Sequence, residues 1–406
     1  MFLKTLVLNC GSSTLKYKLF EMEGEKLLAG GLADRIGMPG SRFSYQAWGQ
    51  EEVLLETPLS SHGEAIKKML NLITDSIHGV INDVKEIQAV GHRVVHGGES
   101  FDRTVVADNK VLQLLEECSK LAPLHNPANL EGVRLCQELI PHSIQVLVFD
   151  TAFHQTMPKH TYLYPIPYHY YKDYHIRKYG FHGISHQYVA ERVSEIYGLE
   201  TKSQKIISCH LGNGSSLCAV NDGKSVDTTM GLTPLAGIMM GTRCGDIDPS
   251  IISFIEEKQG LNSEKIMEIL NKSSGALGIS GISSDFRDLV QAAGKGNDRA
   301  QLALDMFVYR VAKGIGSLVP AIGGLNILVF TAGIGQNSPE IRRRISSYLN
   351  YLGIILDEDK NSAGGVDVEI SSSGSAVKVL VISTDEERMI ARESQLTVNK
   401  INYATL

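Results

Sequence analysis

Short apolar runs and tight turns alternate at the start of the chain and predict an antiparallel meander of strands. The runs TLVLN, TLKYKLFEM and KLLAGGLAD follow one another with only a few residues between them. Apolar positions then recur at helical spacing over residues 65–77, 110–121 and 128–139, before the apolar run IQVLVFD. This order predicts a mixed sheet with helices packed on it.

The second half of the chain repeats this order. KIISCHLG and SSLCAVND predict a hairpin, residues 263–270 and 298–315 have helical spacing, and NILVF predicts another buried strand. Gly-Ser-Ser begins at Gly11 in the first half and at Gly214 in the second, and VLVFDTAFHQTMP loosely resembles ILVFTAGIGQNSP. These similarities indicate an internal duplication, and a cleft between two similar halves is a natural place for a ligand.

Length, composition and charge limit the function. A chain of 406 residues exceeds the usual size of a single core, so two domains are expected. The absence of an apolar run of about 18 residues and of a secretory signal predicts a cytoplasmic protein without a membrane partner. The net charge of −6 without a basic run argues against nucleic acid. Six scattered cysteines without a C-x-x-C pair predict reduced thiols, mostly in the core.

Both Gly-Ser-Ser turns carry groups suited to phosphate. Gly11 lets the backbone approach a ligand, and Ser12, Thr14 and Lys16 offer donors. In the second turn, His210–Gly214, two glycines flank an asparagine and leave successive N–H groups for an anion. Ordinary hairpin turns remain the alternative. No G-x-x-x-x-G-K-[ST] occurs, and GIGQNS does not complete G-x-G-x-x-G, which argues against P-loop and dinucleotide folds.

The stretch GHRVVHGGE suggests a site for a short carboxylic acid. If AVGHRVV is a strand, Arg93 and Val95 point to the same face. The guanidinium can then bind a carboxylate through two hydrogen bonds while the valine bounds the alkyl end. Leu124 in APLHNPANL would add another apolar wall. A strand arginine in an ordinary ion pair is the alternative.

Two further segments offer positive charge. The tract from Tyr162 to His186 is rich in tyrosine and histidine and predicts scaffold or subunit contact. Its HGISH motif lacks the glutamate of H-E-x-x-H, so His182 better fits charge stabilisation than zinc binding. Arg243 lies in a glycine-flanked loop and could meet a transferring phosphoryl group, unless Asp246 or Asp248 simply pairs with it.

Motifs spread over residues 9–386 resemble the acetate kinase family. They are LNCGSSTLK, GHRVVHGGE, APLHNPANL, FDTAFHQTMP, YGFHGISH, CHLGNGSS, GTRCGDIDP, SGISSDFRD, FTAGIGQNSPE and STDEER. The resemblance implies an α/β fold of duplicated ribonuclease-H-like domains, shared with sugar kinases, heat-shock ATPases and actin, with the active-site cleft between them. It implies one domain of residues 1–150 plus 386–406 on the carboxylate and magnesium side, and another of residues 151–385 on the nucleotide side.

The resemblance also implies an activity. This is the reversible phosphorylation of acetate by ATP to give acetyl phosphate and ADP, with Mg²⁺ or, in its place, Mn²⁺ as cofactor, in a homodimer. A propionate or butyrate kinase of the same family is the alternative. An actin-like ATPase of the same fold is a third reading, but it has no use for the carboxylate clamp suggested by Arg93 and Val95.

The family pattern, carried onto this chain, implies a complete set of site residues. The metal would be held by Asn9 and Glu386, and the carboxylate by Arg93. The methyl group would be enclosed by Val95, Leu124, Phe181 and Pro234. Catalysis would fall to Asp150, His182 and Arg243. ATP would be bound by Ser12, Thr14, Lys16, His210, Leu211, Gly212, Asn213, Gly214, Asp285, Phe286, Arg287, Gly333, Ile334, Gly335, Gln336 and Asn337.

The chain departs from the family in a few places. Thr14 stands where serine is usual, and Ala332 and Gln336 replace glycine and glutamate. STDEER and SDFRD are also typical of capped helix starts, the alternative role for their acidic residues. A carboxylic acid with a pKa near about 4 to 5 is already ionised at neutral pH. Asp150 is therefore predicted to orient Arg243 or a metal-bound water rather than to act as a general base.

Overall fold

The computed structural model describes residues 3–123, 125–198 and 204–404, and the chain divides into two compact units. The first unit is Met1–Phe153 with Asp385–Leu406, and the second is His154–Thr384. The assignment of the carboxylate and metal to the first domain, and of the nucleotide to the second, stays a prediction.

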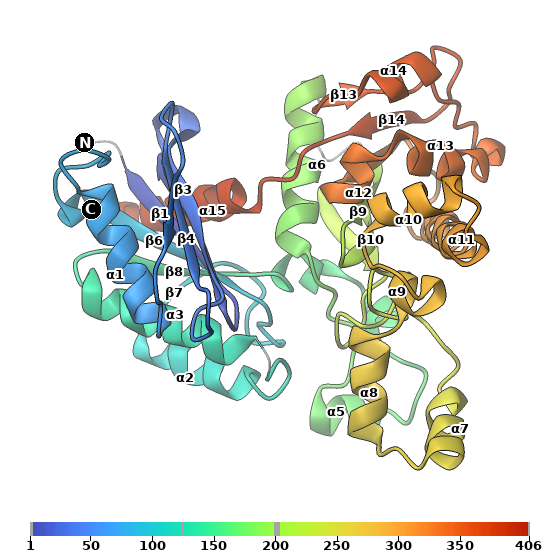
Figure 1. Ribbon diagram of the computed structural model, residues 1–406, viewed down its shortest axis with the longest axis horizontal. Coiled ribbons are helices and arrows are strands. Elements are labelled where there is room, and N and C mark those ends of the chain that lie inside the picture. Colours follow the sequence, from blue (N-terminus) through green and yellow to red (C-terminus); the bar gives the residue numbers. More distant parts are fainter. Residues whose placement is uncertain (1–2, 124, 199–203, 405–406) are drawn as a thin grey trace. The chain divides into compact units, whose positions relative to one another are not determined.

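The described part of the first unit contains one sheet of eight strands in the order β5-β4-β3-β2-β1-β6-β8-β7 (Figure 1). Strands β1 to β5 pair with one another in antiparallel fashion, which confirms the predicted meander, whereas β6 and β8 run parallel to β1. The strands are β1 (Lys4–Cys10), β2 (Thr14–Glu21), β3 (Lys26–Asp34), β4 (Arg42–Ala47), β5 (Val53–Glu56), β6 (Ile87–Val94), β7 (Val105–Val106) and β8 (Ile144–Phe149).

Helices cover this sheet because their apolar positions match those of the strands. Leu6 and Leu8 of β1 pack in one core with Ile66 and Met69 of α1, and α15 packs on β1, β6 and β8. The predicted helix 65–77 ends earlier because the Asp75 carboxylate accepts the N–H groups of residues 77 and 78 and turns the chain. The helices are α1 (His62–Ile73), α2 (Asn109–Cys118), α3 (Asn126–Leu139) and α15 (Glu386–Ala404).

The second unit repeats the central topology of the first. Its described sheet has the order β11-β10-β9-β12-β14-β13, with β12 and β14 parallel to β9. The order β3-β2-β1-β6-β8 thus recurs as β11-β10-β9-β12-β14, which is the predicted duplication. The strands are β9 (Lys205–Leu211), β10 (Ser215–Asn221), β11 (Lys224–Thr228), β12 (Ile327–Thr331), β13 (Val368–Glu369) and β14 (Lys378–Val381).

One sequence similarity was misleading. VLVF lies on β8, the last strand of the repeated order, whereas ILVF lies on β12, the fourth. The two segments therefore do not occupy equivalent strands. They are alike because each is a parallel strand buried on both faces, and such strands are near-continuous apolar runs.

Helices lie on both faces of the second sheet (Figure 1). The two faces differ in polarity. Ile207 and Cys209 of β9 belong to the apolar core with α11. Ser208 and His210 alternate with them and meet α6 on the other face. The helices are α4 (Lys159–Tyr162), α5 (His169–Tyr174), α6 (Gly183–Tyr197), α7 (Ser250–Gln259), α8 (Ser263–Lys272), α9 (Gly275–Ser280), α10 (Phe286–Gly294), α11 (Asp298–Ile322), α12 (Ala332–Asn337), α13 (Pro339–Ser347) and α14 (Glu358–Ala363).

Short 3₁₀ helices complete the two units. They are η1 (Glu23–Glu25), η2 (Val84–Glu86), η3 (Ala152–Thr156) and η5 (Asn350–Leu352). In the described parts of the chain no helix combines the length and apolarity needed to cross a bilayer. All six cysteines are free thiols and only Cys244 is not fully buried, which agrees with the prediction of core thiols.

Candidate active site

The first unit gathers polar side chains at the carboxyl ends of its parallel strands. Arg93 lies near the end of β6, Asp150 directly follows β8, and Asn9 lies near the end of β1. Arg93 donates from Nε to Asp150 Oδ1 at 3.1 Å and from Nη2 to Oδ2 at 2.6 Å. Its Nη1 lies 3.5 Å from Asn9 Oδ1. Because parallel strands end at one edge of a sheet, residues distant in sequence meet here.

Arg93 is held as a cation by this cluster. Burial opposes its charge, but Asp150 and Glu386 outweigh burial and raise the pKa of the guanidinium. The Glu386 carboxylate, at the first position of α15, lies 4.0 Å from Arg93 Nε. The ordinary ion pair considered as the alternative for Arg93 is therefore present. Since Nε and Nη2 face Asp150, a substrate carboxylate would be met by Nη1 and the outer N–H of Nη2.

Asp150 has a partner within its own unit that the sequence did not predict. Its carboxylate, which is almost fully buried, holds the Arg93 guanidinium by two hydrogen bonds. Paired, charge-assisted bonds of this kind fix the plane of a guanidinium. Asp150 therefore orients the proposed carboxylate clamp. Its expected role of orienting Arg243 or a metal-bound water stays a prediction.

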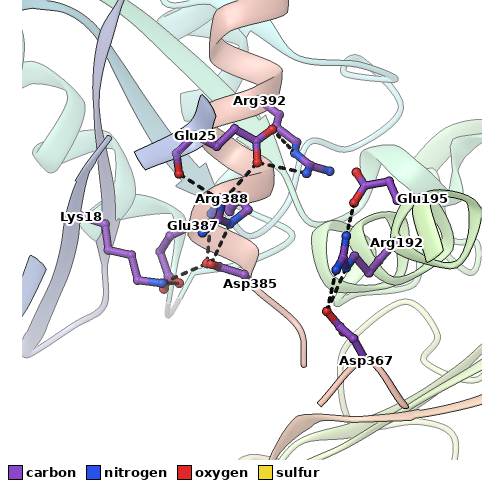
Figure 2. A network of polar contacts seen from close by, with 9 residues as sticks. All are labelled: Lys18, Glu25, Arg192, Glu195, Asp367, Asp385, Glu387, Arg388 and Arg392. Atoms are coloured by element: carbon purple, nitrogen blue, oxygen red, sulfur yellow. Dashed lines mark hydrogen bonds and ion pairs between the residues drawn. The ribbon is translucent and has the colours of Figure 1, made fainter. Parts of the chain in front are cut away.

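Lys16 is held by a carboxylate that the sequence did not single out. Its Nζ lies 2.6 Å from Glu387 Oε1. The neighbouring Lys18, shown in Figure 2, contacts Glu387 at 3.2 Å and Asp385 at 2.9 Å. Burial disfavours the charged form of Glu387, but Lys18 and Lys16 outweigh burial and lower the pKa of its carboxyl group. Glu387, near the start of α15, thus holds the ammonium groups of the two β2 lysines in place.

The first Gly-Ser-Ser turn is a tight hairpin between β1 and β2. Gly11 donates its N–H to the carbonyl of Thr14 at 2.8 Å. A β-carbon on Gly11 would lie 2.5 Å from Thr14 Oγ1, so the turn requires glycine. Ser12 is exposed at its tip. The turn keeps hydroxyl groups accessible, but their contact with phosphate remains a prediction.

Val95 follows β6 and is partly exposed, as is Arg93, whereas Val94 between them is buried. This alternation agrees with the prediction that Arg93 and Val95 share a face, although the strand itself ends at Val94. The Val95 N–H donates to Asn129 Oδ1 at 3.2 Å, and Asn129 donates to the Cys10 carbonyl at 2.7 Å. Asn129 therefore ties the proposed methyl wall to β1. Leu124, the other expected wall from this unit, lies outside the described residues.

In the second unit, His182 occupies a strained position at the start of α6. It is the N-cap residue, with a left-handed backbone (φ 56°, ψ 23°), which costs a non-glycine residue roughly 1–2 kcal/mol. Its Nδ1 is hydrogen-bonded to Ser216 Oγ at 2.9 Å. Its ring stacks on that of His210 with 4.1 Å between centroids, and His210 Nδ1 bonds Ser185 Oγ at 2.8 Å. Both imidazoles are therefore fixed by hydroxyl groups.

His182 and Arg243 converge on the second Gly-Ser-Ser turn. A β-carbon placed on Gly214 would lie 3.4 Å from Arg243 Nη1 and 3.5 Å from His182 Nε2. The adjacent Asn213 accepts the Gly241 N–H through its carbonyl at 3.0 Å, which ties the turn to the loop carrying Arg243. Two nitrogen donors and a glycine backbone thus surround one small space, as a phosphoryl site requires.

Arg243 has no carboxylate within 4 Å among the described residues of its unit. Its Nη1 donates to the Pro234 carbonyl at 3.2 Å. Neither aspartate considered as its partner pairs with it, because Asp246 accepts the Gly237 N–H and Asp248 accepts the Ser250 N–H. Burial lowers the pKa of Arg243. A partly buried cation of this kind favours the arrival of an anion.

Three of the segments predicted to bind ATP line one cavity of about 450 Å³. This volume lies in the range of small-molecule pockets. Asp285 caps α10 by accepting the Arg287 N–H, and the Arg287 side chain lowers the pKa of Asp285 to about 2. The lining residues are Gly212, Asn213, Ser284, Asp285, Phe286, Arg287, Gly333, Ile334, Asn337 and Ser338.

Two residues predicted to bind ATP have their side chains in the core. Phe286 is almost fully buried and packs on Phe307 with 4.4 Å between ring centroids. Leu211 is fully buried in the same core. Both residues lie in motifs that carry predicted nucleotide-binding residues. The alternation of β9 turns the Leu211 side chain inward, and the periodicity of α10 does the same for Phe286. Leu211 can contact a nucleotide only through its backbone. Phe286 packs in the core behind the wall of the cavity.

The segment of residues 333–337, which is expected to bind ATP, forms most of the short helix α12. Ala332, which departs from the family's glycine, has a left-handed backbone with φ 62°. The carbonyls of Gly335 and Gln336 accept hydrogen bonds from Arg342 Nη1 at 2.9 and 2.7 Å. Asn361 accepts from Arg342 Nε at 2.8 Å. Sequence reasoning missed Arg342, although it lies between Ile341 and Ile345 on the buried side of α13.

The oxygen atoms around Arg93 suit a hard divalent cation. Asn9, Asp150 and Glu386 provide an amide and two carboxylates, which are the ligand types that Mg²⁺ prefers. Among the described residues no group of three histidine, cysteine, aspartate or glutamate side chains could enclose a metal alone. Mg²⁺ commonly binds through one or two carboxylates together with substrate phosphates, so the residues present fit such a site.

Comparisons with known proteins agree in pointing to one family. The model of the Acetokinase family matches residues 4–392. The acetate kinase of Caldanaerobacter subterraneus subsp. tengcongensis is 54% identical over 400 residues, covering 98% of this chain and all of the relative. The crystal structure of Porphyromonas gingivalis acetate kinase has a TM-score of 0.93 and 45% identity, covering 98% of this chain and 100% of that one.

A solved propionate kinase is similar to nearly the same degree. The protein from Francisella tularensis subsp. tularensis has a TM-score of 0.91 and 43% identity, covering 97% of this chain and 99% of that one.

Proposed function

Because the chain belongs to the acetokinase family, we propose that it is an acetate kinase. It would transfer the γ-phosphoryl group of ATP reversibly to the carboxylate of acetate and give acetyl phosphate and ADP. The observation that carries this proposal is the convergence of Arg243 and His182 on Gly214. The neighbouring Gly212 and Asn213 line the cavity proposed for the nucleotide.

The first unit would supply the carboxylate clamp. Acetate is ionised at neutral pH, so its oxygen can attack without a general base. Arg93, oriented by Asp150, would meet the carboxylate through Nη1 and the outer N–H of Nη2. Val95, on the same face, would bound the methyl group.

The second unit would stabilise the transferring phosphoryl group. Arg243 and the Nε2 atom of His182 would donate to its oxygens during in-line transfer. Hydrogen bonds that involve a charged group are worth about 1.5–3 kcal/mol each. Because charge spreads over the phosphoryl oxygens mainly in the transition state, these contacts would raise kcat more than they tighten binding.

We propose Mg²⁺ as the cofactor, with Mn²⁺ able to replace it. Asn9 and Glu386 would hold it on the first unit. When bound, such a cation offsets the negative charge of the phosphates. Lys16, held by Glu387, would add a further positive charge at the phosphate chain.

Propionate is the second candidate substrate, because a solved propionate kinase is 43% identical to the chain. Val95 would decide between the two acids by the room that it leaves for one more methylene. The experiment is steady-state kinetics with acetate, propionate and butyrate, each with ATP and Mg²⁺. The highest kcat/KM should belong to acetate. A higher value for propionate would replace the proposed substrate, and no turnover with any acid would refute the function.

We further propose a cytoplasmic homodimer. Large apolar side chains are exposed on the aromatic tract around α5, including Ile166, Tyr168 and Tyr174, and such side chains are enriched at subunit interfaces. Light scattering after gel filtration should give twice the chain's mass of 44.4 kDa. Tyr174→Glu should weaken the dimer, whereas Tyr351→Glu, also at an exposed tyrosine, should not. A monomeric parent would contradict this proposal.

A further inference from the structure

Four side chains form a continuous hydrogen-bond chain between β9, α6 and β10. Ser208 Oγ lies 3.0 Å from His186 Nδ1, and His186 Nε2 lies 2.8 Å from Ser216 Oγ. Ser216 Oγ is also bonded to His182 Nδ1 at 2.9 Å. Ser208, His186 and Ser216 are fully buried. The chain therefore links a buried serine to an imidazole proposed to act on the phosphoryl group.

The direction of the protons in this chain follows from Ser208. Within the described residues, the hydroxyl of Ser208 has one hydrogen-bond partner, His186 Nδ1. If His186 donated from Nδ1, the hydroxyl hydrogen of Ser208 would be buried without an acceptor, which is costly. Ser208 therefore donates to Nδ1.

The remaining two bonds then have only one arrangement. A neutral imidazole that accepts at Nδ1 carries its proton on Nε2, so His186 donates to Ser216. Burial, and then the neighbouring His154 and His210, lower the pKa of His186 well below its usual value and keep it neutral. Among the described residues, Ser216 Oγ has one further hydrogen-bond partner, so it donates its hydroxyl hydrogen to His182 Nδ1.

We propose that Ser208, His186 and Ser216 act as a relay of positioning residues that holds His182 as the neutral tautomer with its proton on Nε2. The Nε2 atom is the one within 3.5 Å of the β-carbon position of Gly214. The relay therefore aims an N–H donor at the phosphoryl space and keeps it there without requiring an imidazolium. This step rests on the proposed function, whereas the tautomer itself does not.

Three features of the second unit favour the neutral form of His182. Its own helix α6 presents its N-terminus, where the helix dipole disfavours a positive charge. Arg243 Nη1 and His182 Nε2 lie near the same point beside Gly214, no more than about 7 Å apart. His210 stacks on the ring from β9, and the neutral His186 approaches through Ser216. Among the described residues of the second unit, the surroundings of His182 thus include a nearby cation and two histidines.

The test is ¹⁵N NMR of histidine-labelled protein, with the His182 signals assigned by their loss in His182→Gln. The parent should show a neutral His182 with the proton on Nε2 from pH 6 to pH 8. Ser208→Ala should let both tautomers form. Its kcat at pH 8 should fall about two- to fivefold, because part of the population would no longer present an N–H at Nε2. Ser208→Thr, which keeps the hydroxyl, should restore the parent's behaviour.

Ser225→Ala is the matched control, because Ser225 is also buried and bonds another histidine, His154 Nδ1, at 2.7 Å. It should leave the His182 tautomer unchanged. A proton on Nδ1 of His182 in the parent, or an imidazolium at pH 7, would overturn the relay even if no variant folds. An unchanged tautomer in Ser208→Ala would also overturn it. If the parent had no kinase activity, the proposed function would fail but the NMR result would stand. Failure of the proposed function and failure of the relay are therefore distinguishable.

Discussion

Gly214→Ala should separate catalysis from stability at the point where His182 and Arg243 converge. The new methyl would lie 3.4 Å from Arg243 Nη1 and 3.5 Å from His182 Nε2, which are ordinary contact distances. The backbone of Gly214 lies outside the left-handed region. The methyl therefore fits the folded protein, and the smaller entropy of the unfolded chain should stabilise it by about 0.4–1 kcal/mol.

The effect on activity should be much larger. A phosphoryl oxygen bonded to both nitrogens at about 2.8 Å would occupy the space that the methyl takes. The loss of two charge-assisted hydrogen bonds, each worth about 1.5–3 kcal/mol, gives about 3–6 kcal/mol in the transition state. This corresponds to a fall in kcat of about 10² to 10⁴.

The assay is steady-state kinetics combined with urea unfolding of the same samples. Gly294→Ala is the control, because this exposed position at the end of α10 has no atom within 4 Å of a new β-carbon. It should gain similar stability and keep the parent's kcat. A folded Gly214→Ala variant with a kcat within tenfold of the parent would refute a phosphoryl site at this turn.

Three further perturbations test other parts of the proposed site and fold. Val95→Ala should shift relative kcat/KM toward propionate by roughly 1–3 kcal/mol, and an unmoved ratio would place the methyl wall elsewhere. Arg93→Ala should raise the KM for acetate by about 10- to 100-fold through loss of charge-assisted bonds, while an unchanged KM would exclude the clamp. Burial lowers the pKa of His92 and His154 to about 4. The unfolded chain therefore binds more protons than the folded protein below about pH 6.5. At pH 5 each of these two histidines should lower the free energy of unfolding by roughly 2 kcal/mol relative to pH 7.5. Urea unfolding should show this loss of stability, and His92→Gln should remove the part of the loss that is due to His92. Equal stability at pH 7.5 and pH 5 would contradict the prediction.

The sequence predicted the fold well where apolar periodicity was strong. The meander, both hairpins and the strand around Arg93 were found because alternation and turn residues agree there. The end of α1 was missed because Asp75 stops the helix through side-chain hydrogen bonds that interrupt no apolar pattern. The match between β8 and β12 was wrong because burial on both faces makes unrelated parallel strands look alike.

The candidate site was predicted less evenly. Sequence motifs identified Arg93, His182 and Arg243 as candidate site residues. They did not identify the side chains that position the site. Arg342 contacts α12 from the next helix, and Ser208 is a small polar residue within an apolar strand. Their roles depend on contacts between separate secondary-structure elements, which periodicity does not encode. The one local signal was a polar side chain at an apolar position.

The most direct test of the proposed function is the detection of its product. The protein should be incubated with ATP, Mg²⁺ and acetate labelled with ¹⁸O in the carboxylate, and acetyl phosphate should be followed by ³¹P NMR and by trapping with hydroxylamine. In-line attack by the carboxylate predicts that acetyl phosphate forms in equal amount to ADP and carries ¹⁸O in the oxygen that bridges carbon and phosphorus. ADP formation with inorganic phosphate but no acetyl phosphate would contradict a carboxylate kinase.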